Sequence, residues 1–175
     1  MQEIYTTHGH NIIKNKERLE KELKVNIGKK GNIIKLDGPA EDEYLAMQVI
    51  EAIDLGFTVE KALLLTQEDF ILEKINIKDV TKRTDIARIK GRLIGTNGKT
   101  KKTIENLGDC LITIHDSTIG IIGFAEEIEM TLTAIESLIR GKKQSKVYNY
   151  MEKERIREKT KLNQDLGLKI RKKKE

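Results

Sequence analysis

The residues whose types and spacing could do chemistry lie within 91–105, in the sequence GRLIGTNGKTKKTIE. This spacing predicts the end of one helix, a four-residue turn at 95–98, and the start of a second helix. Glycine at both ends of the turn permits unusual backbone angles and lets another backbone approach closely. The N–H groups at the start of the second helix suit an anion. Because Lys99, Lys101 and Lys102 follow at once, the stretch predicts a phosphate-binding turn for a nucleic-acid strand.

Three interpretations of this turn compete. The nucleotide-binding P-loop, GxxxxGK[ST], would need its first glycine at Leu93, where a leucine blocks close approach of a phosphate. The GXXG loop of KH domains joins two short helices and clamps the sugar–phosphate path of about four nucleotides. The sequence LIGTNGK at 93–99 resembles that loop. An ordinary helix-turn-helix corner without a ligand is the third interpretation.

Composition limits the class of protein. The chain has 175 residues, enough for one large or two small domains, and 38% of them are hydrophobic and 35% charged, which predicts modest cores under a charged surface. No run of about 18 apolar residues is present, and the start MQEIYTTHGH lacks an apolar signal core. A single cysteine excludes a disulfide framework. We therefore expect a cytoplasmic protein with no membrane contact.

Positive charge is concentrated in two places. The formal net charge is +5, and residues 151–175, with 10 Lys and Arg against 5 Asp and Glu, account for all of it. Within the otherwise neutral remainder, residues 82–102 hold a second basic group, opposed only by Asp85. Its members are Lys82, Arg83, Arg88, Lys90, Arg92, Lys99, Lys101 and Lys102. A basic turn and a basic C-terminal tail are expected of a protein that binds a polyanion.

An internal repeat divides the chain. Residues 19–56 align without a gap on residues 104–141, at a constant offset of 85. The identical pairs are Glu20/Glu105, Ile27/Ile112, Ile34/Ile119, Gly38/Gly123, Ala40/Ala125, Glu41/Glu126, Ile50/Ile135, Glu51/Glu136 and Gly56/Gly141. The apolar positions also correspond, so the pattern predicts a duplicated supersecondary unit.

Both copies carry the same order of predicted elements: a helix end, an alternating strand, a second strand and a long amphipathic helix ended by glycine. In the first copy the helix end is 19–23, the two strands are 25–27 and 33–36 with GKKG at 28–31 as the hairpin connection, and the long helix runs from Pro39 to Gly56. In the second copy the helix end is 104–107, the two strands are 110–114 and 118–122, and the long helix runs up to Gly141. The offset places the turn 95–98 on His10–Ile13, which contains no glycine. We therefore expect the first copy to keep the fold and to have lost the phosphate clamp.

These elements predict an α+β protein with two tandem type I KH-like domains, each a three-stranded sheet packed by helices, the first one degenerate. Phe70, Leu72, Ile75 and Ile77 would mark the first strand of the second domain, and 147–158 a charged helix before a disordered basic tail. The predicted divisions are 1–56 for the degenerate domain, 57–71 for a connecting helix, 72–141 for the domain with the GXXG loop, and 142–175 for the charged helix and basic tail.

The sequence contains no set of residues that indicates enzymatic chemistry. His8 and His10 lack partners at metal-ligand spacing, Cys110 falls on the inward phase of its strand, and His115 next to a turn is expected to be solvated. No nucleophile–base set is recognisable, so we expect no enzyme, no metal and no cofactor. Aromatic residues are only 4% of the chain, which disfavours folds that stack bases on aromatic platforms.

The stretches RIKGRLIGTNGKTKKTIE and SKVYNYMEKER together resemble the family of archaeal two-KH RNA-processing proteins. Its eukaryotic counterpart is the small-subunit assembly factor called partner of Nob one. The resemblance implies single-stranded RNA binding near the 3′ end of small-subunit (16S) ribosomal RNA, a role in its maturation, and partnership with the 3′-end endonuclease and archaeal initiation factor two. The RNA-binding residues expected on this basis and from the basic cluster are Gly95, Thr96, Asn97, Gly98, Lys99, Thr100, Lys101, Lys102, Arg88 and Arg92.

Two other functions remain open from the sequence. A general single-stranded nucleic-acid binder in transcription or RNA decay would use the same turn. A nucleotide-binding enzyme would use GTNGKT and would bind ATP or GTP with magnesium, which a binding measurement distinguishes.

Overall fold

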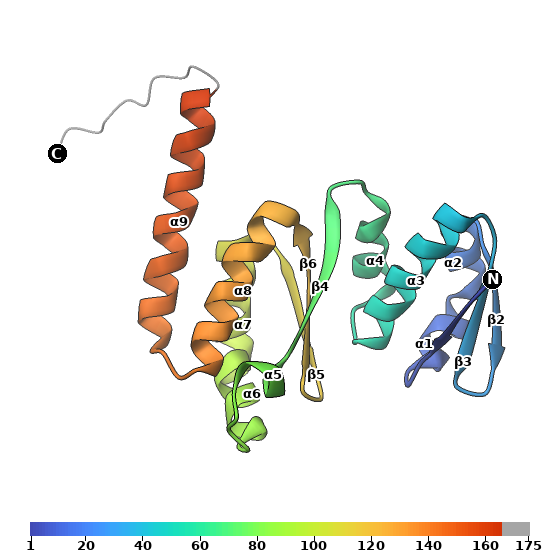
Figure 1. The fold of residues 1–175 in the computed structure, drawn as a ribbon, viewed down its shortest axis with the longest axis horizontal. Helices are drawn as coiled ribbons and strands as arrows, with labels where there is room; N and C mark the ends of the chain where they lie inside the picture. Colours follow the sequence, from blue (N-terminus) through green and yellow to red (C-terminus); the bar gives the residue numbers. More distant parts are fainter. Residues whose placement is uncertain (166–175) are drawn as a thin grey trace.

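The computed structural model describes residues 1–165 and shows two units of similar architecture followed by a long C-terminal helix (Figure 1). The first unit consists of β1 (Gln2–Tyr5), α1 (Gly9–Lys14), α2 (Lys16–Leu23), β2 (Asn26–Lys30), β3 (Ile33–Asp37) and α3 (Ala40–Asp54). Its sheet is antiparallel with strand order β1-β3-β2. Alternate residues such as Ile27, Ile34 and Leu36 are buried against the helices, as period-two patterning requires.

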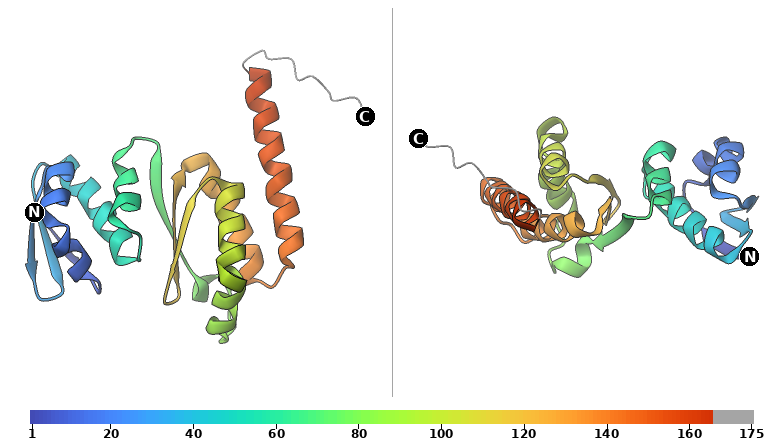
Figure 2. Two further views of the ribbon diagram at one scale, coloured as in Figure 1. Left: turned by 180° about the vertical axis from the view of Figure 1, so that it is seen from behind. Right: turned by 90° about the horizontal axis from the view of Figure 1, so that it is seen from above.

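A short connection leads to the second unit through α4 (Val59–Ala62) and a 3₁₀ turn η1 (Leu63–Thr66). The second unit consists of β4 (Phe70–Asn76), α5 (Ile77–Val80), α6 (Ile86–Ile94), a 3₁₀ turn η2 (Thr96–Gly98), α7 (Lys99–Gly108), β5 (Leu111–His115), β6 (Thr118–Phe124) and α8 (Ala125–Ile139). Its antiparallel sheet has the order β4-β6-β5. The last helix, α9 (Gln144–Asp165), packs on α7 and α8 on the side away from the sheet (Figures 1 and 2). None of the helices described is long and apolar enough to cross a bilayer.

The strand registers support the predicted duplication. Ile27 pairs with Leu36 in the first sheet and Ile112 with Ile121 in the second, so both pairs keep the offset of 85. The first strands do not keep it. Ile4 pairs with Ile34 and Ile75 with Ile119, so the first strands are offset by 71 and the first unit is 14 residues shorter between strand and helices. The second unit uses that length for α5 and the approach to the glycine turn.

Glycines end the two long helices as predicted. Gly56 and Gly141 have φ of +100° and +101°, which glycine adopts without strain. The amide of Phe57 donates to the Ala52 carbonyl at 3.1 Å, and the equivalent amide of Lys142 donates to Ser137 at 2.9 Å. These bonds satisfy carbonyls that a helix end leaves open. The second of them turns the chain toward α9.

Strand β6 is buried on both faces, which joins the two units. Ile119 and Ile121 face the helices of the second unit, whereas Ile122 belongs to the apolar core of the first. A Cβ atom on Gly120 would lie 3.0 Å from Phe57, so only a glycine lets the first unit pack this closely. The first unit therefore covers the sheet face that the second unit's own helices leave open (Figure 1).

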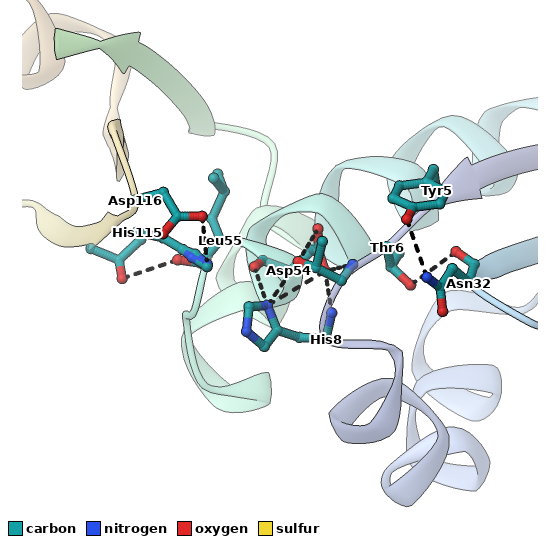
Figure 3. A network of polar contacts seen from close by, with 10 residues as sticks. Tyr5, Thr6, His8, Asn32, Asp54, Leu55, His115 and Asp116 are labelled. Atoms are coloured by element: carbon teal, nitrogen blue, oxygen red, sulfur yellow. Dashed lines mark hydrogen bonds and ion pairs between the residues drawn. The ribbon is translucent and has the colours of Figure 1, made fainter.

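Polar contacts complete this junction (Figure 3). The Thr113 hydroxyl donates to the Leu55 carbonyl at 3.3 Å, and the ring of His115 meets that of His8 edge-on, with centroids 4.7 Å apart. His8 also bonds through Nδ1 to the Asp54 carbonyl at 3.0 Å. The prediction that His115 is solvated is wrong, because its side chain is only 27% exposed at the junction.

The junction makes a testable prediction about Gly120. A valine there should destabilise the protein by about 1–3 kcal/mol, because its side chain would press on Phe57 and Leu55 in a closely packed contact. Gly28 in β2 is the matched control, since its Cβ would meet only Lys35 at 3.8 Å and valine suits an exposed strand. Urea unfolding measures both variants. Equal losses for Gly120→Val and Gly28→Val would contradict the tight junction.

Several local predictions are corrected by the structure. Strand β1 was not predicted, and the hairpin between β2 and β3 turns at Gly31 and Asn32 because GKK already belongs to β2. Pro39 is the N-cap of α3 and not its first residue, and Ile77 opens α5. Helix α9 is longer than 147–158, so 159–165 are helical instead of disordered. The predicted basic tail beyond Asp165 lies outside the described residues.

Candidate nucleic-acid interface

The glycine turn joins α6 to α7 as predicted from its spacing. Helix α6 ends at Ile94, and Gly95 leaves it with φ +72° and ψ +174°, angles that are essentially restricted to glycine. Asn97 and Gly98 both adopt left-handed angles, with φ of +53° and +75°. Asparagine is among the few residues that tolerate this region. The sequence Gly-Thr-Asn-Gly therefore matches the backbone of this turn position by position.

The two glycines are needed for different reasons. A Cβ on Gly95 would lie 2.8 Å from both the Cβ and the amide nitrogen of Thr100, so a side chain has no room. A Cβ on Gly98 would meet nothing within 4 Å, and only its positive φ favours glycine. Gly95 is thus fixed by packing and Gly98 by conformation alone.

Two amides predicted to be open to an anion are already bonded within the turn. The Gly98 amide donates to the Gly95 carbonyl at 3.2 Å, and the Lys99 amide donates to the Thr96 carbonyl. The tight 3₁₀ geometry of η2 brings these groups together. These two amides are therefore not free to bind an anion while the turn keeps this geometry.

The ten predicted RNA-binding residues fall into two groups. Thr96, Asn97, Lys99, Lys102 and Arg88 are exposed, while Gly95, Gly98, Lys101 and Arg92 are half-buried and Thr100 is only 4% exposed. All ten lie on α6, the turn or α7, so the structure brings them to one end of the second unit. Lys101 lies 3.7 Å from the Glu105 carboxylate, whereas Arg92 and Thr100 are bonded to the α8–α9 segment.

A small apolar cavity lies in the core of the second unit, where α6, α7, the sheet and α8 meet. It holds only about 10 Å³ of free space, and every residue around it except one is aliphatic. The lining residues are Leu93, Lys101, Ile104, Ile112, Ile114, Ile119 and Ile135.

Known proteins share the sequence and the fold of this unit. Residues 71–156 match the model for the second domain of PNO1, described as a eukaryotic-type KH domain (KH-domain type I). The crystal structure of Dim2p from Pyrococcus horikoshii OT3 is 30% identical, with a TM-score of 0.79 over 87% of this chain and 99% of that one. The chain belongs to the PNO1/Dim2 family of KH-domain proteins.

Other members of the PNO1/Dim2 family match over different lengths. KH domain-containing protein MJ0443 of Methanocaldococcus jannaschii is 33% identical over 147 residues, which cover 80% of this chain and 65% of that protein. Pre-rRNA-processing protein PNO1 of Candida albicans is 41% identical over 57% of this chain and 37% of its own length. A chain of the a/eIF2alpha-aDim2p-rRNA complex from Pyrococcus horikoshii OT3 is 27% identical, with a TM-score of 0.80 over 89% of this chain and 94% of that one. The chain thus spans about two thirds of the first curated relative and less than half of the eukaryotic one.

Further basic residues lie near Gly141 and the start of α9, on the segment that contacts Arg92 of α6. Exposed Lys142 and Lys143 precede α9, and exposed Lys146 lies in its first turn. Arg83 is also close to this segment, since a Cβ on Gly141 would lie 3.8 Å from its Nη1. Arg83 also hydrogen-bonds Asp85, which holds the pKa of that carboxyl below its usual range. Sequence reasoning left these lysines out because they follow the turn by more than 40 positions.

Gln144 is the other residue that sequence reasoning missed. Its side-chain amide donates to the Arg92 carbonyl at 3.2 Å and to the Thr100 hydroxyl at 2.8 Å. The first contact lies on α6 and the second on α7, so one side chain touches both helices that flank the glycine turn. An uncharged glutamine 44 residues from Thr100 gives no local signal of this role.

The groups considered for metal or covalent chemistry have structural contacts. No cluster of three His, Cys, Asp or Glu residues suited to a metal occurs within 1–165. Cys110 is 5% exposed, and burial raises the pKa of its thiol to about 11, so it is a protonated core residue as predicted. Glu126 and Glu127 open α8, where acidic side chains favour the helix dipole.

Proposed function

We propose that this protein binds single-stranded RNA in the maturation of small-subunit (16S) ribosomal RNA, through the GXXG turn of its second unit. The observation that carries the proposal is the Gly-Thr-Asn-Gly turn, with Thr96 and Asn97 exposed at its tip and the exposed Lys99 and Lys102 beside it. Membership of a family with proteins named for pre-rRNA processing supports it. The role is one of binding, without catalysis.

The proposed path of the RNA follows from the chemistry of this surface. Phosphates pass over the turn, where Thr96 and Asn97 carry no charge and Lys99, Lys102 and Arg88 supply positive charge. Bases lie toward the half-buried side chain of Ile114 on β5, since an aliphatic surface accepts the face of a base without stacking it on an aromatic ring. The direct contacts thus come from the exposed members of the predicted set.

The first unit is proposed to be a degenerate KH-like domain. Its strands and helices follow the order of the second unit, but α1 and α2 meet at Asn15 without a glycine turn. The proposed division keeps the first domain at 1–56 and the connection from 57, with the second domain extended to begin at Phe70, where β4 starts, and to end at 141. Val59, Ala62 and Leu65 of the connection pack in the first unit's core.

The proposed target is the 3′ region of small-subunit ribosomal RNA. A neighbouring structure contains aDim2p with a/eIF2alpha and rRNA, which supports RNA and archaeal initiation factor two as partners. The resemblance adds the endonuclease that makes the 3′-end cut as a third proposed partner. A cytoplasmic location is proposed with this role.

A binding competition tests the proposed function. The full chain should prefer the 3′-terminal segment of 16S ribosomal RNA over a scrambled RNA and a DNA of the same sequence by about tenfold or more, equivalent to about 1.4 kcal/mol. Fluorescence titration at one fixed salt concentration gives the three affinities, because salt alters all of them. Equal affinities would indicate a general single-strand binder, and binding of magnesium ATP or GTP would support the nucleotide-binding enzyme.

A further inference from the structure

Residues 142–144, which connect α8 to α9, contact α6 and α7 close to the turn that joins these two helices. Helices α6 and α7 are joined by a turn of four residues, two of them glycines with positive φ. The amide of Gln144, the first residue of α9, bonds the Arg92 carbonyl in the last turn of α6 and the Thr100 hydroxyl in the first turn of α7. A single side chain therefore fixes one helix relative to the other.

Arg92 strengthens this connection from the other side. Its guanidinium Nη2 donates to the Lys142 carbonyl at 2.7 Å, two residues before Gln144. Arg92 thus accepts a hydrogen bond through its backbone and donates one through its side chain, both to the segment 142–144. One of the N–H donors of its guanidinium is therefore used to hold this segment.

Thr100 connects Gln144 to the glycine turn itself. Thr100 is 4% exposed, and its side chain occupies the space in which a Cβ of Gly95 would lie. The Gln144 bond holds the hydroxyl under Gly95, the first residue of the turn. A buried hydroxyl in this position supports the turn and does not reach a strand that passes over it.

Helix α9 provides a rigid base for Gln144. Val147 and Met151, one and two turns further on, are 2% and 0% exposed in the core of the second unit. Side chains held by packing position a binding site more closely than side chains on a free segment. Gln144 is therefore placed before any ligand arrives.

We propose that Gln144 is a positioning residue of the RNA clamp, which sets the angle between α6 and α7 and so the shape of the Gly-Thr-Asn-Gly turn. Thr100 acts through Gln144 and does not touch the RNA, while the Arg92 side chain holds the residues before Gln144 through the Lys142 carbonyl. The inference rests on the proposed RNA binding at this turn. Preorganisation of a site raises affinity because less ordering remains to be done on binding. Loss of Gln144 should therefore weaken binding without removing any direct RNA contact.

The experiment compares Gln144→Ala, Thr100→Val, their double variant and Thr100→Ser with the wild type. Asn149→Ala, exposed on the same helix, is the control. Gln144→Ala removes two hydrogen bonds, each of which contributes about 1 kcal/mol, so it should lower RNA affinity about 5- to 30-fold. Circular dichroism shows whether the variant is folded. Thr100→Ser keeps the hydroxyl and should bind nearly as the wild type, and the double variant should bind no more weakly than Gln144→Ala.

Two readouts distinguish positioning from general destabilisation and from direct contact. The slope of log affinity against log salt should be unchanged in Gln144→Ala, whereas Lys99→Ala should reduce it by about 0.7, the value for one phosphate contact on a single strand. Amide hydrogen exchange of the free protein should become faster at residues 95–99 and stay the same in β5 and β6. A reduced slope in Gln144→Ala would make Gln144 a contact residue and overturn the proposal.

The exchange measurement needs no RNA and therefore tests the inference separately from the proposed function. Unchanged exchange at 95–99 in Gln144→Ala would show that Gln144 does not hold the turn, whatever the RNA affinity is. Additive affinity losses in the double variant would show that Gln144 and Thr100 act independently, which also overturns the proposal. Faster exchange without any change in RNA affinity would show that Gln144 holds the turn and that the RNA binds elsewhere on the protein.

Discussion

Replacing Thr96 and Asn97 together by aspartate should abolish tight RNA binding while the protein remains folded. The two carboxylates would face the phosphates, and like charges juxtaposed at an interface cost several kcal/mol, which corresponds to a loss of about 100-fold or more. Both residues are exposed, and aspartate tolerates the left-handed backbone of Asn97, so stability should change by only about 0.5 kcal/mol. Fluorescence titration with the ribosomal RNA segment, beside a urea unfolding curve, measures both effects.

The matched control for this variant lies in the first unit. His10 and Asn11 occupy the positions that the offset of 85 places on the turn, and both are exposed. The next position, Ile12, is fully buried and therefore unsuitable. His10→Asp with Asn11→Asp adds the same two negative charges and should reduce affinity far less. Similar losses in both double variants would indicate that general charge, and not the clamp, controls binding.

Replacing Gly95 by alanine should destabilise the second unit strongly. The added methyl group would overlap Thr100, and the backbone angles of Gly95 lie in a region that is essentially restricted to glycine. Strain and overpacking together should cost about 2–5 kcal/mol, relieved only if α6 and α7 move apart. Urea unfolding gives the loss, and hydrogen exchange shows whether it is concentrated at the turn.

Replacing Gly91, four residues before Gly95, by alanine should have the opposite effect on stability. Gly91 lies inside α6 with no atom within 4 Å of its added Cβ, so alanine there should stabilise the protein by about 0.5–1 kcal/mol. The two substitutions are chemically identical and differ only in backbone angle and surroundings. A Gly95→Ala protein as stable as the wild type would show that Thr100 does not fill the space under the turn.

Local sequence determined the features that depend on neighbouring residues. Gly95, Asn97 and Gly98 are the residue types that positive φ requires, and the structure places each of them there. Gly56 and Gly141 likewise end their helices with bonds between residues five or fewer apart. The repeat is also visible in the strand registers, because the pairing of β2 with β3 and of β5 with β6 keeps the offset of 85.

Tertiary structure decided the features that depend on residues distant in the chain. Strand β1 is four residues long with one half-buried position, and pairing with β3 defines it rather than its own pattern. His115 looks like a turn residue, but the first unit covers it.

The same holds for the clamp. The Thr100 hydroxyl and the Arg92 side chain make hydrogen bonds to residues 44 and 50 positions away, Gln144 and Lys142. Propensity and spacing act over a few residues, whereas a hydrogen bond between α6, α7 and α9 exists only after those helices have packed. Sequence therefore determined where the glycine turn is, and the packing of α9 decided which hydrogen bonds Thr100 and Arg92 make within the protein.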